Sequence, residues 1–222
     1  MFIRPKLLVF GVSSFARMVG EFAALLPETE FIGFTANERF ITCDRLDGFP
    51  VFSFENLATH CPPANYSMYV ALEYARQSAD RQRLRNEAAT AGYHMASIVH
   101  PSAVISRSAK IGAHCLIGES VVVQAFAEIG DNVSLNARAF LGESARLGDN
   151  VYLGAGVIVE RQAQVGDHVT IRSGTIIAEG RKVGADTTLA AHSVIANDLP
   201  PGTLTHPFLT GLGRIVDKRR PG

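Results

Sequence analysis

The sequence has little that would point to nucleic acid, a disulfide framework or a membrane. Lys plus Arg and Asp plus Glu number 21 each, so the formal net charge is zero, whereas a phosphate-binding surface needs a surplus of basic side chains. Cys43, Cys61 and Cys115 are too few and too scattered for disulfide bonds or a zinc site. No run approaches the roughly 18 apolar residues that span a bilayer. We therefore expect a cytoplasmic protein without a metal and without nucleic-acid or membrane partners.

The first half of the sequence lacks the G-x-G-x-x-G spacing of dinucleotide-binding dehydrogenases, which argues against that class of enzyme. It alternates strand-like and helix-like segments instead. The expected strands are Lys6–Val12, Phe31–Thr35 and Tyr66–Leu72, and the expected helices are Ser14–Leu26 and Ala79–Ala91. This order predicts a small parallel α/β sheet over residues 1–95. Ligands of such sheets bind at the carboxyl ends of the strands.

The second half has no helical period but a strict repeat of six residues. An aliphatic residue begins every hexad, at Ile111, Ile117, Val123, Ile129, Leu135, Leu141, Leu147, Leu153, Val159, Val165, Ile171, Ile177, Val183, Leu189 and Ile195. The fifth position is small or medium in every hexad except at Arg181. Because side chains of a strand alternate sides, the first and fifth positions share a face. Large and small side chains are therefore expected to alternate into one narrow interior.

A coarser period of eighteen residues accompanies the hexads. Glycine follows the aliphatic residue at Gly112, Gly130, Gly148, Gly166 and Gly184. Glycine at a fixed corner is typical of a turn that needs positive φ. Three hexads per coil predict a triangular prism of short parallel strands, the parallel β-helix that hexapeptide repeats indicate. We assign it residues 96–205 and a C-terminal tail residues 206–222.

The chain resembles the hexapeptide-repeat acyltransferases, and its two halves together are similar to the sialic acid and bacillosamine acetyltransferase branch. The resemblance is carried by FGVSSFARMVGEFA, GYHMASIVHPSAVIS, the hexads and the closing NDLPPGT, and it covers essentially the whole chain. It implies a Rossmann-like α/β domain followed by a left-handed parallel β-helix. It also implies a homotrimer with active sites between neighbouring prisms. The implied reaction is acetyl transfer from acetyl-CoA to an amine or hydroxyl of a sugar or nucleotide-sugar.

The sequence departs from the family at the catalytic position. Acyl transfer needs a base for the attacking amine or hydroxyl and a donor for the oxyanion. The family places a histidine seven residues after an asparagine. Asn136 matches the asparagine, but Glu143 occupies the histidine position and Ser144 follows it. Glu143, Asn136 and Ser144 are thus the candidate catalytic residues.

Three interpretations of this departure stay open. Glu143 can be the general base, since a carboxylate in a low-dielectric cleft can accept a proton near neutral pH. Alternatively, another histidine takes over, the candidates being His114, His168 and His192, although such corner residues are usually solvated. The third interpretation is a catalytically silent trimer that binds a sugar or CoA.

The resemblance also implies ligand-binding residues. The positions that match the family's CoA contacts are Tyr152, Ser173 and Ala191, and Gly154 and Gly174 could let a pantetheine arm approach the backbone; simple corner glycines are the alternative. In the first half, the candidates for substrate binding are Gly11, Ser13, Ser14, Asn37 and Glu73. Ser13 and Ser14 precede a helix, where backbone N–H groups bind phosphate or where serine acts as an N-cap.

Overall fold

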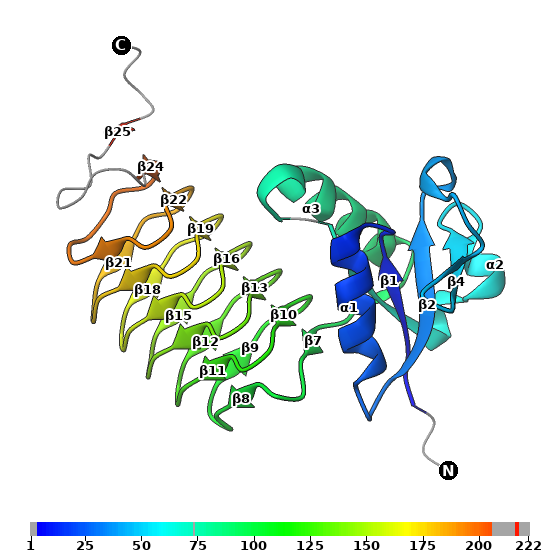
Figure 1. The fold of residues 1–222 in the computed structure, drawn as a ribbon, viewed down its shortest axis with the longest axis horizontal. Helices are drawn as coiled ribbons and strands as arrows, with labels where there is room; N and C mark the ends of the chain where they lie inside the picture. Colours follow the sequence, from blue (N-terminus) through cyan, green and yellow to red (C-terminus); the bar gives the residue numbers. More distant parts are fainter. Residues whose placement is uncertain (1–3, 73, 206–215, 218–222) are drawn as a thin grey trace. The chain divides into compact units, whose positions relative to one another are not determined.

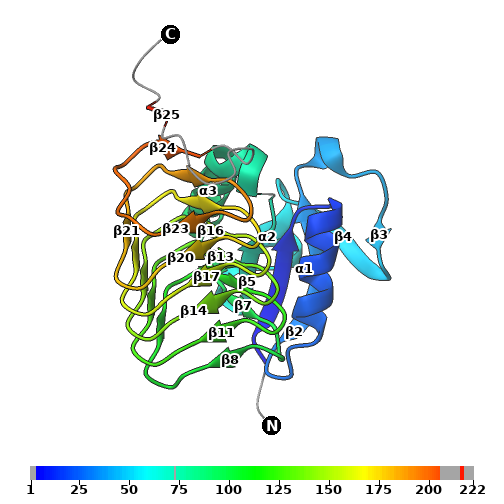
Figure 2. The same ribbon diagram turned by 60° about the vertical axis from the view of Figure 1, so that its left-hand side comes forward.

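The computed structural model describes residues 4–72, 74–205 and 216–217 of the chain. The chain divides into two compact units, Met1–Pro101 and Ser102–Gly222, drawn in Figures 1 and 2. The sequence-based boundary after residue 95 falls in a loop of the first unit. Most of the expected tail, residues 206–222, lies outside the described residues.

The first unit is built on a mainly parallel sheet with strand order β3-β4-β2-β1-β5-β6, in which only β3 and β4 pair antiparallel. The strands of this sheet are β1 (Lys6–Phe10), β2 (Glu30–Ala36), β3 (Arg45–Leu46), β4 (Phe49–Ser53), β5 (Tyr66–Val70) and β6 (His94–Met95). The short strand β7 (Ile98–Val99) lies outside it. The helices of the unit are α1 (Ser14–Ala24), α2 (Leu57–His60) and α3 (Tyr74–Thr90), with 3-10 turns η1 (Glu38–Phe40) and η2 (Pro63–Asn65). The expected strands and helices are all present, with ends that differ by a few residues.

Helices cover both faces of this sheet because β1 is apolar on both sides. Leu8 and Phe10 pack in one cluster with α2 and α3, and the alternation of a strand sends Leu7 and Val9 to the opposite face, where α1 packs. All four are buried. A Cβ at Gly20 of α1 would lie 2.8 Å from a ring carbon of Phe34 in β2, so glycine lets the helix approach the sheet closely.

The second unit consists of stacked coils, each contributing one two-residue strand to each of three sheets (Figure 2). The β8 sheet holds β8 (Val104–Ile105), β11 (Val122–Val123), β14 (Phe140–Leu141), β17 (Ile158–Val159), β20 (Ile176–Ile177) and β23 (Val194–Ile195). The β9 sheet holds β9 (Lys110–Ile111), β12 (Glu128–Ile129), β15 (Arg146–Leu147), β18 (Gln164–Val165) and β21 (Lys182–Val183). The β10 sheet holds β10 (Leu116–Ile117), β13 (Ser134–Leu135), β16 (Tyr152–Leu153), β19 (Thr170–Ile171), β22 (Thr188–Leu189), β24 (Thr203–Leu204) and the antiparallel β25 (Val216–Asp217).

Strands of successive coils pair in parallel at a spacing of eighteen residues, as in Leu135 with Leu153 and Leu141 with Val159. The predicted parallel β-helix is therefore present, and its stacked sheets fit a left-handed β-helix. The predicted interior is also confirmed. From Ile117 to Ile195 every first-position aliphatic residue is buried, and so is every fifth-position residue from Cys115 to Thr175.

The glycines of the eighteen-residue period serve a different purpose from the one that the sequence suggested. Positive φ falls on the fourth hexad position, for example at His114 (58°), Ser144 (56°) and Gly174 (69°), whereas Gly130 is not in that region. A Cβ at Gly130 would instead lie 2.7 Å from the carbonyl carbon of Gly148 in the next coil. The prediction of a positive-φ corner at these glycines was wrong: they allow neighbouring coils to stack closely.

The sixth hexad position points outward, and the outward rows of two sheets differ sharply. On the β8 sheet the row is wholly apolar: Val104, Val122, Phe140, Ile158, Ile176 and Val194. On the β9 sheet it is polar: Lys110, Glu128, Arg146, Gln164 and Lys182. A hydrogen bond from Lys110 at 3.0 Å and the nearby charge of Arg146 hold the pKa of Glu128 below its ordinary value. We call the first set the apolar row and the second the charged row.

Candidate functional site

A cavity of about 510 Å³ opens in the first unit at the carboxyl ends of β1, β2 and β5. β1 is the middle strand, with β2 on one side and β5 on the other, so the chain leaves the sheet centre in both directions. Such a switch in strand order opens a crevice at which open α/β sheets bind ligands. The lining residues are Phe10, Gly11, Val12, Ser13, Ala36, Asn37, Arg39, Phe40, Leu72, Asp80, Arg83 and Leu84.

The loop after β1 brings two of the predicted substrate-binding residues to this cavity. Gly11 has φ of 132°, and a Cβ there would lie 2.8 Å from the carbonyl oxygen of Ala71, so only glycine fits. The Ser13 hydroxyl accepts a hydrogen bond of 3.3 Å from the backbone N–H of Ala16 and thus caps α1. Ser14 lines a separate hollow beside α1, and Glu73 lies outside the described residues.

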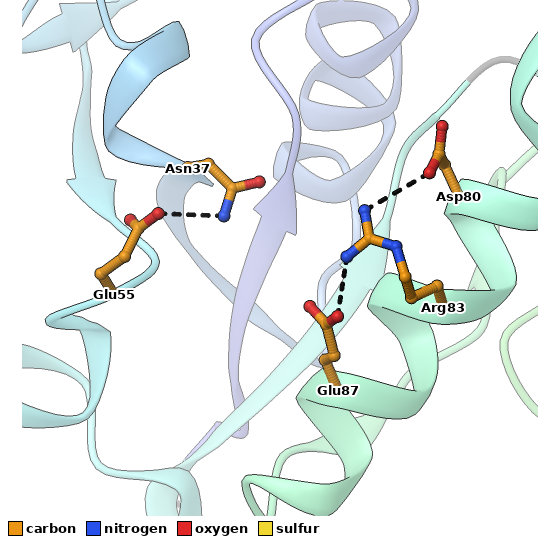
Figure 3. Close-up of polar contacts among 5 residues, drawn as sticks. All are labelled: Asn37, Glu55, Asp80, Arg83 and Glu87. Carbon is orange, nitrogen blue, oxygen red and sulfur yellow. Dashed lines mark hydrogen bonds and ion pairs between the residues drawn. The ribbon is translucent and has the colours of Figure 1, made fainter.

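Asn37, the predicted substrate contact after β2, lines the cavity and is held by a carboxylate from another strand. Its amide nitrogen donates a 3.0 Å hydrogen bond to Oε1 of Glu55, which follows β4 (Figure 3). The other carboxylate oxygen accepts from the Glu38 backbone N–H at 3.0 Å and from the Ser53 hydroxyl at 2.9 Å. Loss of some water around the carboxylate raises the pKa of the exposed Glu55, but the hydrogen bonds, including one from its own backbone, outweigh this effect and leave that pKa below its ordinary value.

Helix α3 contributes a charged wall to the same cavity. The Arg83 guanidinium lies between two carboxylates of its own helix, with Nη1 2.7 Å from Oε1 of Glu87 and Nη2 3.3 Å from Oδ1 of Asp80 (Figure 3). Arg39 lies across the ring of Phe40 at 4.7 Å from its centroid. The cavity lining thus carries the guanidinium groups of Arg39 and Arg83, which can bind an anionic ligand, together with the Asp80 carboxylate that already pairs with Arg83.

In the β-helix, Glu143 lies at the corner that follows the β8 sheet, and its side chain is exposed. Its backbone N–H donates to Oε1 of Gln124 at 3.1 Å, and its carbonyl accepts from Gln162 at 2.9 Å. In the next coil, Arg161 takes the equivalent position and pairs with Glu179 at 3.1 Å. Ser144, next in the chain, is half-buried with φ of 56°.

The other candidate residues lie at or beside the corner that follows the β10 sheet. Asn136 is anchored there, because its Nδ2 donates to the carbonyl of Leu153 in the next coil at 2.8 Å. Tyr152, in β16 before this corner, is half-buried. A Cβ at Gly154 would lie 2.5 Å from the backbone nitrogen of Ser173, and one at Gly174 would contact the His192 ring. Both glycines therefore have a packing role.

The same corner carries a strip of small uncharged side chains at the third hexad position. The strip consists of Ala137, Ala155, Ser173 and Ala191, each eighteen residues from the next, and it begins one coil after Glu119, which takes the same position. The corresponding positions of the other two corners include Glu143, Arg161, Asp131 and Asp149. A thin, extended ligand can lie close to the backbone along such a strip. Ser173 and Ala191 of the predicted CoA contacts belong to it.

The three candidate histidines are far from equivalent. The expectation that all are solvated corner residues was wrong for His114, which is fully buried. Its Nδ1 lies 2.8 Å from Oδ1 of Asn132, whose amide in turn donates to Asn150 at 2.7 Å. This ladder supports the corner that follows the β9 sheet. His168 and His192 are exposed at two different corners.

Two further features bear on the class of site. Among the described residues, no group of three or more His, Cys, Asp and Glu side chains is placed to hold a metal ion. In the same part of the chain, no helix has both the length and the apolar character needed to cross a bilayer.

The fold is similar to that of solved sugar acetyltransferases of the hexapeptide-repeat type. No protein-family model matches the sequence, and no curated protein sequence matches it. Several solved structures, however, are similar to the structure of this chain. A mutant of perosamine N-acetyltransferase from Caulobacter crescentus, in complex with CoA and GDP-perosamine, is 25% identical, with 95% of this chain and 96% of that chain covered and a TM-score of 0.81.

The acetyltransferase domain of PglB from Neisseria gonorrhoeae, in complex with acetyl coenzyme A, is also 25% identical. The comparison covers 96% of this chain and 100% of that chain, with a TM-score of 0.83. WeeI from Acinetobacter baumannii, at 18% identity and a TM-score of 0.70, shares the fold. The resemblance that the sequence indicated is confirmed by these neighbours.

Sequence reasoning missed several residues of the first-unit cavity, namely Arg39, Asp80, Arg83 and the supporting Glu55. The expected helix over residues 79–91 is rich in Arg and Glu, a composition typical of an exposed surface helix. No local pattern distinguishes Arg83 from the other arginines of this helix. Only the packing of α3 against β5 and β6 places it at the ends of the strands.

Proposed function

We propose that the protein transfers an acyl group from an acyl-CoA to an amine or hydroxyl of a sugar or nucleotide-sugar. The observation that carries the proposal is the likeness to acetyltransferases over nearly the full length of both chains, including one in complex with CoA and GDP-perosamine. The first unit supplies a Rossmann-like domain whose cavity is the acceptor site. The β-helix supplies the base and the acyl-CoA surface.

In this proposal the CoA arm lies along the small-residue strip of the corner after the β10 sheet. Ser173, Gly174 and Ala191 lie on that corner, and Tyr152 and Gly154 flank it. From Ala137 to Ala191 the third-position side chains there are small and uncharged, in contrast to most of those at the other corners in the same coils, and this supports the assignment. CoA supplies the activated thioester, and the chain's own groups orient it.

Glu143 acts as the general base. Its carboxylate takes the proton from the attacking nitrogen or oxygen as that atom bonds to the thioester carbon. Asn136 and Ser144 are the candidate donors for the oxyanion. When the carbon–sulfur bond breaks, the proton passes to the departing CoA thiolate, which leaves free CoA and an acylated sugar.

The proposal includes a homotrimer, with the active site between neighbouring prisms. The apolar row on the β8 sheet supports it, since Val104 and Val194 expose 64% and 68% of their surface in the single chain. The end of β14 in this sheet leads directly to Glu143. A partner covering the row would also bring surface against that carboxylate and lower its contact with water.

The test is a thiol-release assay with acetyl-CoA and nucleotide-sugars. We expect Glu143→Gln to reduce turnover by about 10²-fold or more, as loss of a general base does. Glu179→Gln is the matched control, because Glu179 occupies the same hexad position of the same corner two coils further on. Turnover that survives Glu143→Gln would exclude Glu143 as the base.

The second candidate is a catalytically silent trimer that binds a sugar or CoA. The exposure of Glu143 in the single chain favours it, because a solvated carboxylate is a weak base at neutral pH. A thermal-shift experiment separates the candidates. Stabilisation by acetyl-CoA together with an absence of turnover for every acceptor supports the silent protein, and gain of turnover in Glu143→His would indicate descent from an active enzyme.

A further inference from the structure

Glu55, which does not line the cavity, determines whether the oxygen or the nitrogen of the Asn37 amide faces the cavity. An asparagine side chain carries an acceptor oxygen and a donor nitrogen on one planar group, so fixing one end fixes the other. An ionised carboxylate only accepts hydrogen bonds. The Asn37 nitrogen must therefore face Glu55, at 3.0 Å. Figure 3 shows the amide oxygen directed away from Glu55, on the side of Arg83.

The carboxylate itself is held firmly enough to impose this orientation. Its second oxygen accepts from the backbone N–H of Glu38 and from the hydroxyl of Ser53. These contacts connect the loop after β4 to η1 after β2. Because its pKa lies below the ordinary value, Glu55 stays ionised at neutral pH and cannot donate to Asn37.

We infer that Glu55 is a positioning residue that makes Asn37 a fixed hydrogen-bond acceptor, so the cavity selects a nucleotide that offers a donor at this point. The inference rests on the proposed function and specifies its acceptor substrate. Two donors differ between otherwise similar nucleotides: the ring N–H of uracil and guanine, and the ribose 2′-hydroxyl, which a deoxynucleotide lacks. At the same ring position cytosine and adenine present an acceptor, so a base contacted through its ring nitrogen would meet the Asn37 oxygen with repulsion; the donor on their base edge is the exocyclic amino group instead.

Replacement of Glu55 by glutamine should remove the selection without removing the cavity. Glutamine offers one oxygen and one NH₂ group. If its oxygen keeps the contacts with Glu38 and Ser53, its NH₂ group faces Asn37. The Asn37 amide can then turn round and present N–H to the cavity. The variant should therefore lose the preference for a donor-bearing ligand or reverse it.

The experiment measures the Kd values of nucleoside diphosphates by isothermal titration calorimetry with the full chain. The pairs UDP and CDP, and GDP and ADP, test the base edge, whereas UDP and 2′-deoxy-UDP, and GDP and 2′-deoxy-GDP, test the ribose. In the wild-type protein we expect a preference of about tenfold or more for the donor-bearing member of at least one pair. In Glu55→Gln the same ratio should fall below about threefold or reverse.

Two variants keep the test decisive. Asn37→Ala removes the acceptor while leaving Glu55 in place, and it should abolish the same preference. Glu30→Gln makes the same chemical change at the opposite end of β2 and should keep it. Circular dichroism and melting temperature establish that each variant is folded.

Three outcomes would overturn the inference. If nucleotides bind the wild-type protein but no pair shows a preference, Asn37 is not a selective acceptor. If a preference exists and persists in Glu55→Gln, the carboxylate does not set it. Both results leave the proposed function standing. If no nucleotide binds at millimolar concentration, the nucleotide-sugar part of the proposed function falls together with this inference.

Discussion

Glycine has two distinct roles in the β-helix, and they fall on different hexad positions. At the second position, as in Gly130, a side chain would run into the backbone of the next coil, 2.7 Å away. At the fourth position, as in Gly180, φ is 69° but the space around a Cβ is open. Other fourth-position residues, such as Phe126 and His168, adopt the same φ without being glycine. Glycine is therefore required more strictly where a Cβ has no space, at the second position, than where φ is positive, at the fourth.

This distinction predicts different costs for the same substitution. Gly130→Ala should lower the free energy of unfolding by about 3 kcal/mol, because two backbones of a close-packed stack would have to separate. Gly180→Ala should cost only about 1 kcal/mol, the penalty for an L-residue in the left-handed region. Urea unfolding followed by circular dichroism measures both. Equal losses for the two variants would refute the assignment of roles.

At the scale of elements, helix α1 begins beside the cavity, and Ser13 has a role in both. Its hydroxyl caps the helix, and the residue also lines the cavity. Ser13→Ala should therefore destabilise the first unit by about 1 kcal/mol. Ser13→Asp keeps a capping oxygen and should retain stability, but its charge would repel a diphosphate. We expect Ser13→Asp to bind UDP or GDP more weakly than the wild-type protein, as measured by calorimetry. If the affinity of Ser13→Asp is unchanged, the phosphates bind away from Ser13.

The elements differed in how well the sequence predicted them, for a physical reason. The coils of the β-helix repeat a local rule, since each hexad must send Leu141 or its equivalents and Ala145 or its equivalents inward. The hexad pattern can therefore be recognised in the sequence without knowledge of the fold. The β3–β4 hairpin and α2 carry no such period, and they were not predicted.

The candidate site was less predictable than the fold because its residues meet through tertiary packing. Asn37 follows a strand end and could be proposed from that position alone. Glu55 reaches it from a different strand, and Arg83 reaches the cavity from a helix whose sequence resembles a solvated surface. The spacing of these three residues along the chain does not indicate that they lie close together in the fold.

At the scale of the whole molecule, the contrast between the apolar row and the charged row predicts which face is buried on assembly. We expect the wild-type chain to be a trimer by light scattering. Ile158→Asp, which places a charge in the middle of the apolar row, should yield monomers, because an unpaired charge in an apolar interface is strongly unfavourable.

Gln164→Asp is the matched control for this prediction. It introduces the same side chain at the equivalent outward position of the β9 sheet, between Arg146 and Lys182, and should leave the trimer intact. A wild-type protein that scatters as a monomer would contradict both the homotrimer and an active site between prisms.

The stacking of coils also restricts how the length of this chain can change during evolution. Each coil pairs only with the coil before and the coil after it, so the β-helix is a linear array of like units. Gain or loss of eighteen residues preserves every inward column and simply lengthens or shortens the array. A change that is not a multiple of six would turn aliphatic residues such as Leu153 towards water, and a change of six or twelve would move every later strand to a different sheet, unless the extra residues loop out at a corner. Insertions among relatives of this protein should therefore come as whole coils or as corner loops.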